Sequence, residues 1–372
     1  MAISRKGRRT PWGLYGLAGF VAISIALLFL FAPNRGVEAS GAGANGGENG
    51  GLALTAPLPT KVGKDTVLVV GDPVTRWVFE QNGWDKELPF TIRWAEITGG
   101  PDVTEAFYAR ALDVGVGANV PPIHATWIGL PVRIIAIRQR RDPLHHPAYV
   151  LGIAPKAGIN RIEDLRGKRI AFSPSQVQSQ VVVQTLKALG LTHKDVKLVE
   201  LPSNIGGDVY TSSLASNEVD VAPIGGGIVA ERYVRKFGRD GAKTLPHPPF
   251  RDDLALSYVP VSTLENPGKA AALAIYIRYW VKAQQWQQTH KAELARGYYE
   301  QHQGLPAADA RLIVDAAGDI DLPSDWREAR AYQQQSIDLL SAETGRPRFD
   351  AATLFDPRFE PLATVPATVA AR

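Results

Sequence analysis

Short apolar segments that end in loops containing Gly, Pro or Ser recur along this chain, and these loops lead into helical patterns. The first loop follows the buried-type strand at 66–70, and others follow Ile97, Val116 and Phe172. A fifth loop, at 223–227, has the same position after a strand. Strands that alternate with helices predict parallel sheets covered on both faces, so the expected fold class is α/β. Because the carboxyl ends of parallel strands meet at one edge, where ligands bind, the five loops predict a ligand cleft.

The segment RIAFSPSQVQSQVVVQTLKALG, at 169–190, shows this pattern most fully. Its strand ends at Phe172, and the residues after it predict a helix with Ser173 as the N-cap, Pro174 as the first helical residue and Gly190 at the stop. The N-terminus of such a helix presents unpaired N–H groups to an anion or a polar ligand. The alternative is an ordinary strand-to-helix turn that binds nothing.

The charge distribution argues against nucleic acid as a partner. Of 41 basic and 37 acidic residues, five basic and one acidic residue lie in 1–39, so the remaining 36 and 36 balance. A neutral body has no excess of positive charge to bind phosphates. The chain also has no cysteine, which excludes disulfides, thiolate catalysis and cysteine-ligated zinc.

Residues 1–39 have the features of an export signal. A basic start precedes an uncharged apolar stretch, and 37–39 place small residues at the two positions that a signal peptidase reads. The alternative is a retained membrane anchor at 11–32, since the apolar stretch is nearly long enough to span a bilayer. Both readings predict that the rest of the chain is periplasmic. The Gly-rich segment 40–64 is expected to be a flexible linker.

The familiar catalytic motifs are missing from the sequence. It contains no P-loop, no complete dinucleotide fingerprint, no G-x-S-x-G elbow and no H-E-x-x-H pair. The adjacent pair His145-His146 lacks metal-ligand spacing and is interpreted as part of an exposed loop. The Trp and Tyr residues at 276–299 recur at helical intervals and are interpreted as helix packing. We therefore expect no catalysis, no cofactor and no metal.

Several segments resemble one known family in order and spacing. IEDLRGKRIAFSPSQ is similar to the entry into the second lobe of the substrate-binding proteins of ABC importers for nitrate, sulfonate, taurine and thiamine precursors. GGPDVTEAFYARALDVGVGANVPPIHATWIGLPVRIIA resembles their first lobe, and SLASNEVDVAPI and LFDPRF resemble later elements. The resemblance covers about 66–360. It implies a type II periplasmic-binding-protein fold, with two α/β lobes, two crossover strands as the hinge and a ligand closed between the lobes.

The resemblance also implies a set of ligand contacts. Residue by residue, these fall on Gly100, Pro101, Gly117 through Asn119, Ser175, Gln176, Gln178 and Gly225. Many relatives have Thr-Gly-Glu at 117–119 and Trp-Asp-Pro at 225–227, so the glycines here predict a larger and less negative pocket. From the residues themselves we add Thr98, Ser173 and Tyr258 as polar lining. Arg76 is the candidate cation, and the alternative is that it is simply exposed.

Lobe one is expected to comprise 65–152 and 258–372, and lobe two 153–257. The predicted function is that of an extracytoplasmic solute-binding protein that captures a small, sulfonate-like organic anion and delivers it to an ABC permease. It would meet the membrane only through the N-terminus or the permease. Three alternatives remain open: a binding protein for pyrimidine precursors of thiamine, a synthase-like enzyme on the same fold, or a membrane-anchored ligand sensor. The enzyme would need a catalytic His in the cleft, and His124 is the nearest candidate.

Overall fold

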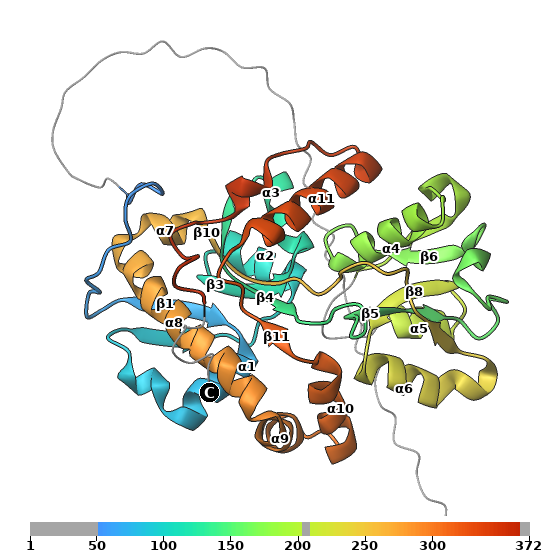
Figure 1. The fold of residues 1–372 in the computed structure, drawn as a ribbon, viewed down its shortest axis with the longest axis horizontal. Coiled ribbons are helices and arrows are strands. Elements are labelled where there is room, and N and C mark those ends of the chain that lie inside the picture. Colours follow the sequence, from blue (N-terminus) through green and yellow to red (C-terminus); the bar gives the residue numbers. More distant parts are fainter. Residues whose placement is uncertain (1–50, 203–208, 365–372) are drawn as a thin grey trace, which may run out of the picture. The chain divides into compact units, whose positions relative to one another are not determined.

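A computed structural model describes residues 51–202 and 209–364, which contain two separate mixed sheets with helices around them (Figure 1). The first sheet has six strands in the order β11-β4-β10-β3-β1-β2. β1 pairs in parallel with β2 and β3, while β10 is antiparallel to both β3 and β4. We call this sheet and its helices lobe one. Its strands are β1 (Val67–Gly71), β2 (Thr91–Trp94), β3 (Val114–Ala118), β4 (Val132–Arg140), β10 (Ala255–Pro260) and β11 (Ile320–Asp321).

The second sheet has five strands in the order β7-β6-β8-β5-β9 and forms lobe two. β6 pairs in parallel with β7 and β8, and β5 runs antiparallel to β8 and β9. Each lobe has its own apolar core. The strands of lobe two are β5 (Tyr149–Ile153), β6 (Arg169–Phe172), β7 (Lys197–Glu200), β8 (Val221–Gly225) and β9 (Lys243–Leu245).

The chain crosses between the sheets twice, from β4 to β5 and from β9 to β10. Two α/β lobes joined by two crossings are what the fold prediction requires. The crossings lie a few residues before the expected lobe boundaries at 152/153 and 257/258, so each of these boundaries falls inside a strand.

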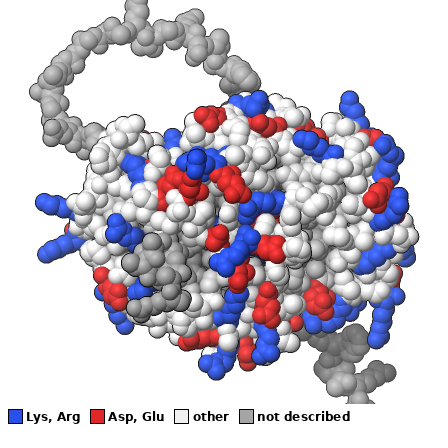
Figure 2. Space-filling model, viewed as in Figure 1, with Lys and Arg blue, Asp and Glu red and all other residues white. Residues whose placement is uncertain are grey.

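Acidic and basic side chains are intermixed over lobe one on the face shown in Figure 2.

Helices cover the sheets, and the C-terminal helices return to lobe one (Figure 1). The α-helices are α1 (Pro73–Asn82), α2 (Gly100–Tyr108), α3 (Val120–Trp127), α4 (Val177–Ala188), α5 (Val209–Ala215), α6 (Ile228–Phe237), α7 (Val261–Glu265), α8 (Pro267–Thr289), α9 (Lys291–Leu294), α10 (Ala307–Ala317) and α11 (Arg327–Thr344). A π-helix, η5 (Ala295–His302), follows α9. The 3₁₀ turns are η1 (Trp84–Glu87), η2 (Ile162–Leu165), η3 (His193–Asp195), η4 (Gly238–Asp240) and η6 (Ala351–Leu354).

The helix after β6 starts later than the sequence predicts. α4 begins at Val177 with Gln176 at its N-cap, so Ser173 is not the cap and Pro174 is not the first helical residue. The backbone N–H of Gln176 donates to the carbonyl of Ser173 at 3.1 Å, which closes a turn before the helix. The prediction was wrong here because Ser and Pro favour turns as well as helix starts. In this segment the turn comes first, and the helix begins after it.

Part of the predicted linker is packed rather than free. Leu54, Leu58 and Val62 lie against the core of lobe one, and the N–H of Leu52 donates to the carbonyl of Glu265 at 2.7 Å. These spaced apolar side chains provide burial that the glycines before them cannot. The predicted export signal or anchor at 1–39 lies outside the described residues. Within 51–202 and 209–364, no helix is both long and apolar enough to cross a membrane.

Candidate functional site

A pocket of about 790 Å³ lies at the carboxyl edge of the lobe-one sheet. Its floor comes from the residues after β1, the loop after β2, the ends of β3 and β4, and the start of β10. α8, α9, η5 and α10 supply further lining residues. This is the edge at which the sequence predicts ligand binding, because the loops that follow parallel strands gather there. The C-terminal helices turn that edge into a walled pocket.

Arg138, near the end of β4, brings a positive charge into this pocket. Its Nη1 donates to Oε1 of Gln284, on α8, at 2.8 Å. Within the part of the chain that the structure describes, Arg138 has no carboxylate partner. A guanidinium whose direct partner is a neutral amide keeps most of its five donors for a ligand.

Asp72 brings a negative charge to the same pocket. It caps α1, and its Oδ1 accepts from the backbone N–H of Thr75 at 3.1 Å. Burial raises the pKa of Asp72, and the bonds from Thr75 and the charge of Arg138 oppose this rise. Nε1 of Trp280 is buried without a partner at hydrogen-bond distance among the described residues, yet it lies near enough to lower that pKa slightly.

The other basic groups in the lining are already paired. Nη1 of Arg140 donates to the carbonyls of His146 and Pro147, the latter at 2.9 Å, and burial lowers the pKa of Arg140. Lys291 forms an ion pair of 2.7 Å with Asp319. Among the described pocket cations, Lys291 is thus paired with a carboxylate and Arg140 with two backbone carbonyls, whereas Arg138 donates to a side-chain amide.

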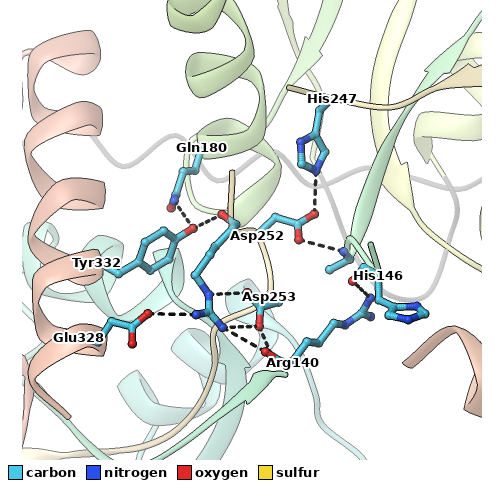
Figure 3. A network of polar contacts seen from close by, with 10 residues as sticks. Arg140, His146, Gln180, His247, Asp252, Asp253, Glu328 and Tyr332 are labelled. Atoms are coloured by element: carbon cyan, nitrogen blue, oxygen red, sulfur yellow. Dashed lines mark hydrogen bonds and ion pairs between the residues drawn. The ribbon is translucent and has the colours of Figure 1, made fainter. Parts of the chain in front are cut away.

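Two acidic residues of the lining tie the lobe crossings together (Figure 3). The carboxylate of Asp252 accepts from the backbone N–H groups of Ala148 and Tyr149 at 2.9 and 2.7 Å. Asp253 accepts from the backbone N–H of Arg140 at 2.5 Å and from Nε of Arg251 at 2.9 Å. These carboxylates connect the two crossings. Their oxygens are occupied by these hydrogen bonds, whereas, within the described residues, Asp72 accepts only from Thr75.

Apolar and aromatic side chains form another part of the lining. Tyr298 and Tyr299 of η5 both line the pocket, together with Leu294, Leu305 and Val314. The aromatic residues at 276–299 are thus only partly helix packing as predicted: Tyr276 is fully buried, but Trp280, Tyr298 and Tyr299 line the pocket. π-helical turns are frequent at functional sites, and this one presents two adjacent tyrosines.

Among the sequence-predicted site residues, Thr98, Gly117 and Ala118 line the pocket. Gly100 lies instead against Gln176, since a Cβ built on Gly100 would be 3.1 Å from Oε1 of Gln176. Pro101 follows in the first turn of α2. Gly100 and Gln176 come from different lobes, so the structure brings them together where the lobes meet, outside the pocket lining.

Asn119 belongs to a buried polar network rather than to the pocket lining. Its Nδ2 donates to Oε1 of Gln180 at 2.6 Å and to Oγ of Ser336 at 2.9 Å. Its carbonyl accepts from Nε2 of Gln333 at 2.7 Å. Tyr258 is fully buried, and its ring packs edge-on against Phe107 at 5.3 Å between centroids. Both residues are thus placed in the protein interior.

The remaining predicted residues lie around the start of α4 and the end of β8. Ser173 is buried, Ser175 and Gln178 are half-buried, and none of the three lines the pocket. Gly225, the last residue of β8, pairs with Tyr149, the first residue of β5. Of the glycines at 225–227, from which the sequence predicts a larger pocket, Gly227 leaves no free space for a ligand. A Cβ on Gly227, at φ +66°, would lie 2.6 Å from Cβ of Ala316, so α10 fills that space.

Arg76 is not the cation of the pocket. It is half-buried and forms ion pairs with Glu80 at 2.7 Å and Glu96 at 2.5 Å. Arg138 is not among the predicted site residues, because in the sequence it follows the largely apolar run 132–137 and opens a segment rich in Arg and Pro. Strand direction could have identified it. β10 lies between β3 and β4 and is antiparallel to both, so β4 runs in the same direction as β3 and ends at the same edge of the sheet. In the described ranges, no group of three His, Asp or Glu side chains could hold a metal ion.

Comparisons with known proteins bear on the fold and the family. The family described as NMT1/THI5 like matches residues 80–235. A putative aliphatic sulfonates-binding protein of Escherichia coli (strain K12) is 26% identical over 106 residues, which are 28% of this chain and 32% of that protein. The match therefore spans about a third of that relative.

Solved structures match over more of the chain. The alkanesulfonate-binding protein SsuA from Xanthomonas axonopodis pv. citri, bound to MOPS, has a TM-score of 0.64 at 18% identity and covers 81% of this chain and 99% of its own. SsuA from Escherichia coli has a TM-score of 0.61 at 19% identity, over 78% of this chain and 90% of its own. These matches confirm the type II periplasmic-binding-protein fold. The family match and the Escherichia coli relative confirm the resemblance to the aliphatic sulfonate-binding proteins.

Proposed function

We propose that this chain, which carries an NMT1/THI5-like domain on the fold of the sulfonate-binding proteins, is an extracytoplasmic solute-binding protein. It captures a small organic anion, of the sulfonate or carboxylate type, and delivers it to an ABC permease. The observation that carries this proposal is the guanidinium of Arg138. It faces a pocket of about 790 Å³ and its direct partner there is a neutral amide.

The chemistry around Arg138 suits an oxyanion. An arginine fork donates two parallel N–H bonds to planar or trigonal oxygen groups, and such charge-assisted bonds are about twice as strong as neutral ones. Gln287 and Gln288 line the same pocket and add amide donors. The tyrosines and leucines of the lining accommodate an organic tail, whose space a bare inorganic anion would leave unfilled.

The lining also favours binding over catalysis. The described residues that line the pocket include no histidine and no serine, and the chain has no cysteine. His124 is in α3 and is not part of the lining. A synthase-like enzyme that requires a catalytic His in the cleft therefore lacks support from this pocket. The periplasmic location rests on residues 1–39, as does the alternative of an anchored sensor.

The test is a thermal-shift and calorimetry screen with sulfonates, sulfonate esters, carboxylates and thiamine precursors. A ligand present at a hundredfold excess over its dissociation constant stabilises the folded form by about 2.7 kcal/mol. Arg138→Gln should abolish the shift caused by an organic anion. Arg76→Gln is the matched control, because it removes an arginine that is already paired with Glu80 and Glu96. No shift with any organic anion, or full binding by Arg138→Gln, would contradict the proposal.

A further inference from the structure

The pocket contains two opposite charges that are held apart. Arg138 donates to Oε1 of Gln284 at 2.8 Å, and Nε2 of Gln284 points to Oγ1 of Thr75 at 3.4 Å. The backbone N–H of Thr75 in turn donates to Oδ1 of Asp72 at 3.1 Å. One amide and one threonine thus stand between the guanidinium and the carboxylate. Among the described residues, Arg138 and Asp72 form no ion pair with each other or with any other group.

Asp72 is buried, and the groups around it do not neutralise it. Its direct donor is the backbone of Thr75, and among the described residues Arg138 is the one cation whose charge lowers the pKa of Asp72. The other ionisable groups close enough to feel its charge are Tyr276, Tyr298 and Tyr299. A buried carboxylate without a cationic partner is costly, and such a group persists where function uses it.

We propose that the ligand is zwitterionic, with its anionic group on Arg138 and a protonated amine on Asp72. This inference rests on the proposed function of the same pocket and specifies its substrate class. The amine would supply the cation that Asp72 lacks, and the anion would supply the partner that Arg138 lacks. Gln284 and Thr75 set the spacing between the two subsites. A ligand with only an anionic group would leave Asp72 buried and unpaired beside it.

The test compares two ligands of nearly equal shape, 3-aminopropane-1-sulfonate and butane-1-sulfonate, which carry an ammonium or a methyl group at one end. The protein variant is Asp72→Asn, since asparagine caps a helix as well as aspartate does and removes only the charge. Calorimetry should show that the wild-type protein binds the amino compound at least tenfold more tightly. Asp72→Asn should abolish this preference, chiefly by weakening the amino compound.

The control is Glu80→Gln, which removes a negative charge that pairs with Arg76 outside the pocket lining. It should leave the preference for the amino compound intact. Equal wild-type affinities for the two sulfonates, or an equal effect of Asp72→Asn on both, would overturn the zwitterion inference and leave the anion-binding function standing. If the wild-type protein binds neither sulfonate, nor 4-aminobutanoate or pentanoate, the proposed function fails as well.

Discussion

Nδ2 of Asn119, at the N-cap of α3 in lobe one, donates a hydrogen bond of 2.6 Å to Oε1 of Gln180, on α4 in lobe two. Nε2 of Gln180 donates onward to the hydroxyl of Tyr332 on α11 at 2.8 Å. The same Nδ2 of Asn119 also reaches Ser336 of α11. Three elements far apart in the sequence therefore share one buried polar network at the contact between the lobes. The hydrogen bonds of such a network rigidify the contact that they join.

Replacing Asn119 by alanine should destabilise this arrangement of the lobes. The substitution leaves Oε1 of Gln180 buried without its donor, at a cost of about 1–3 kcal/mol for an unsatisfied polar group. Chemical unfolding should show the loss. The control is Asn82→Ala, which removes one bond to the carbonyl of Val78 within α1. A loss no greater for Asn119→Ala than for Asn82→Ala would contradict the role of the network.

Asp72 should make stability depend on pH in a defined direction. Burial raises its pKa above the ordinary value of 3.8, so the folded state binds a proton that the unfolded state has already released. By linkage, this group's contribution is fully present below pH 3.8 and is lost as pH rises through the folded-state pKa. The free energy of unfolding of Asp72→Asn minus that of the wild type should therefore increase as pH rises above 3.8. A difference that stays constant from pH 4 to pH 8 would refute this.

Gly227 should tolerate no side chain. Its φ of +66° disfavours other residues, and a Cβ there would lie 2.6 Å from Cβ of Ala316. Gly129, at φ +80°, has open space around the same position. Gly227→Ala should therefore cost more unfolding free energy than Gly129→Ala, for which only the backbone strain of about 1 kcal/mol applies. The second substitution Ala316→Gly should recover part of the excess, and no recovery would show that the contact with α10 is not its cause.

The double variant Ser175→Ala with Gln176→Ala tests the ligand contacts that the resemblance implies at the start of α4. Neither residue lines the pocket, and Gln176 lies against Gly100 where the lobes meet. We expect this variant to weaken anion binding by less than Arg138→Gln does, because it alters the contact between the lobes rather than the subsite. Calorimetry with the same anion compares the two. A greater loss of affinity in the double variant would indicate that the anion binds at the start of α4 instead.

The sequence predicts the arrangement of strands and helices well, and it identifies the edge of lobe one where the pocket lies. Local patterns carry this information, since a buried strand followed by a Gly- or Pro-containing loop has few alternatives. Thr98 and Gly117 follow from that reasoning and do line the pocket. Arg138 was within reach of the same argument, because β4 ends at that edge.

The other site residues depend on partners that no local pattern shows. Asn119 has its partners 61 and 217 residues away, at Gln180 and Ser336. Tyr258 is on β10, which lies between two other strands and is covered on both faces, so its hydroxyl does not mark a surface. The part of the pocket formed by η5 and α10 comes from the last third of the chain. Its place opposite β1 and β4 depends on how that third returns to lobe one.

The hydrogen bonds of Asp252 and Asp253 to backbone N–H groups of the opposite crossing have a mechanical consequence. Two independent tethers would let the lobes twist as well as open. Tethers that are cross-linked close to both sheets act as a single ribbon, which bends easily about one axis and resists torsion. Each opening would thus return the lobes along the same path. One broken peptide bond in either crossing would leave the lobes connected by the other crossing and by the cross-links themselves.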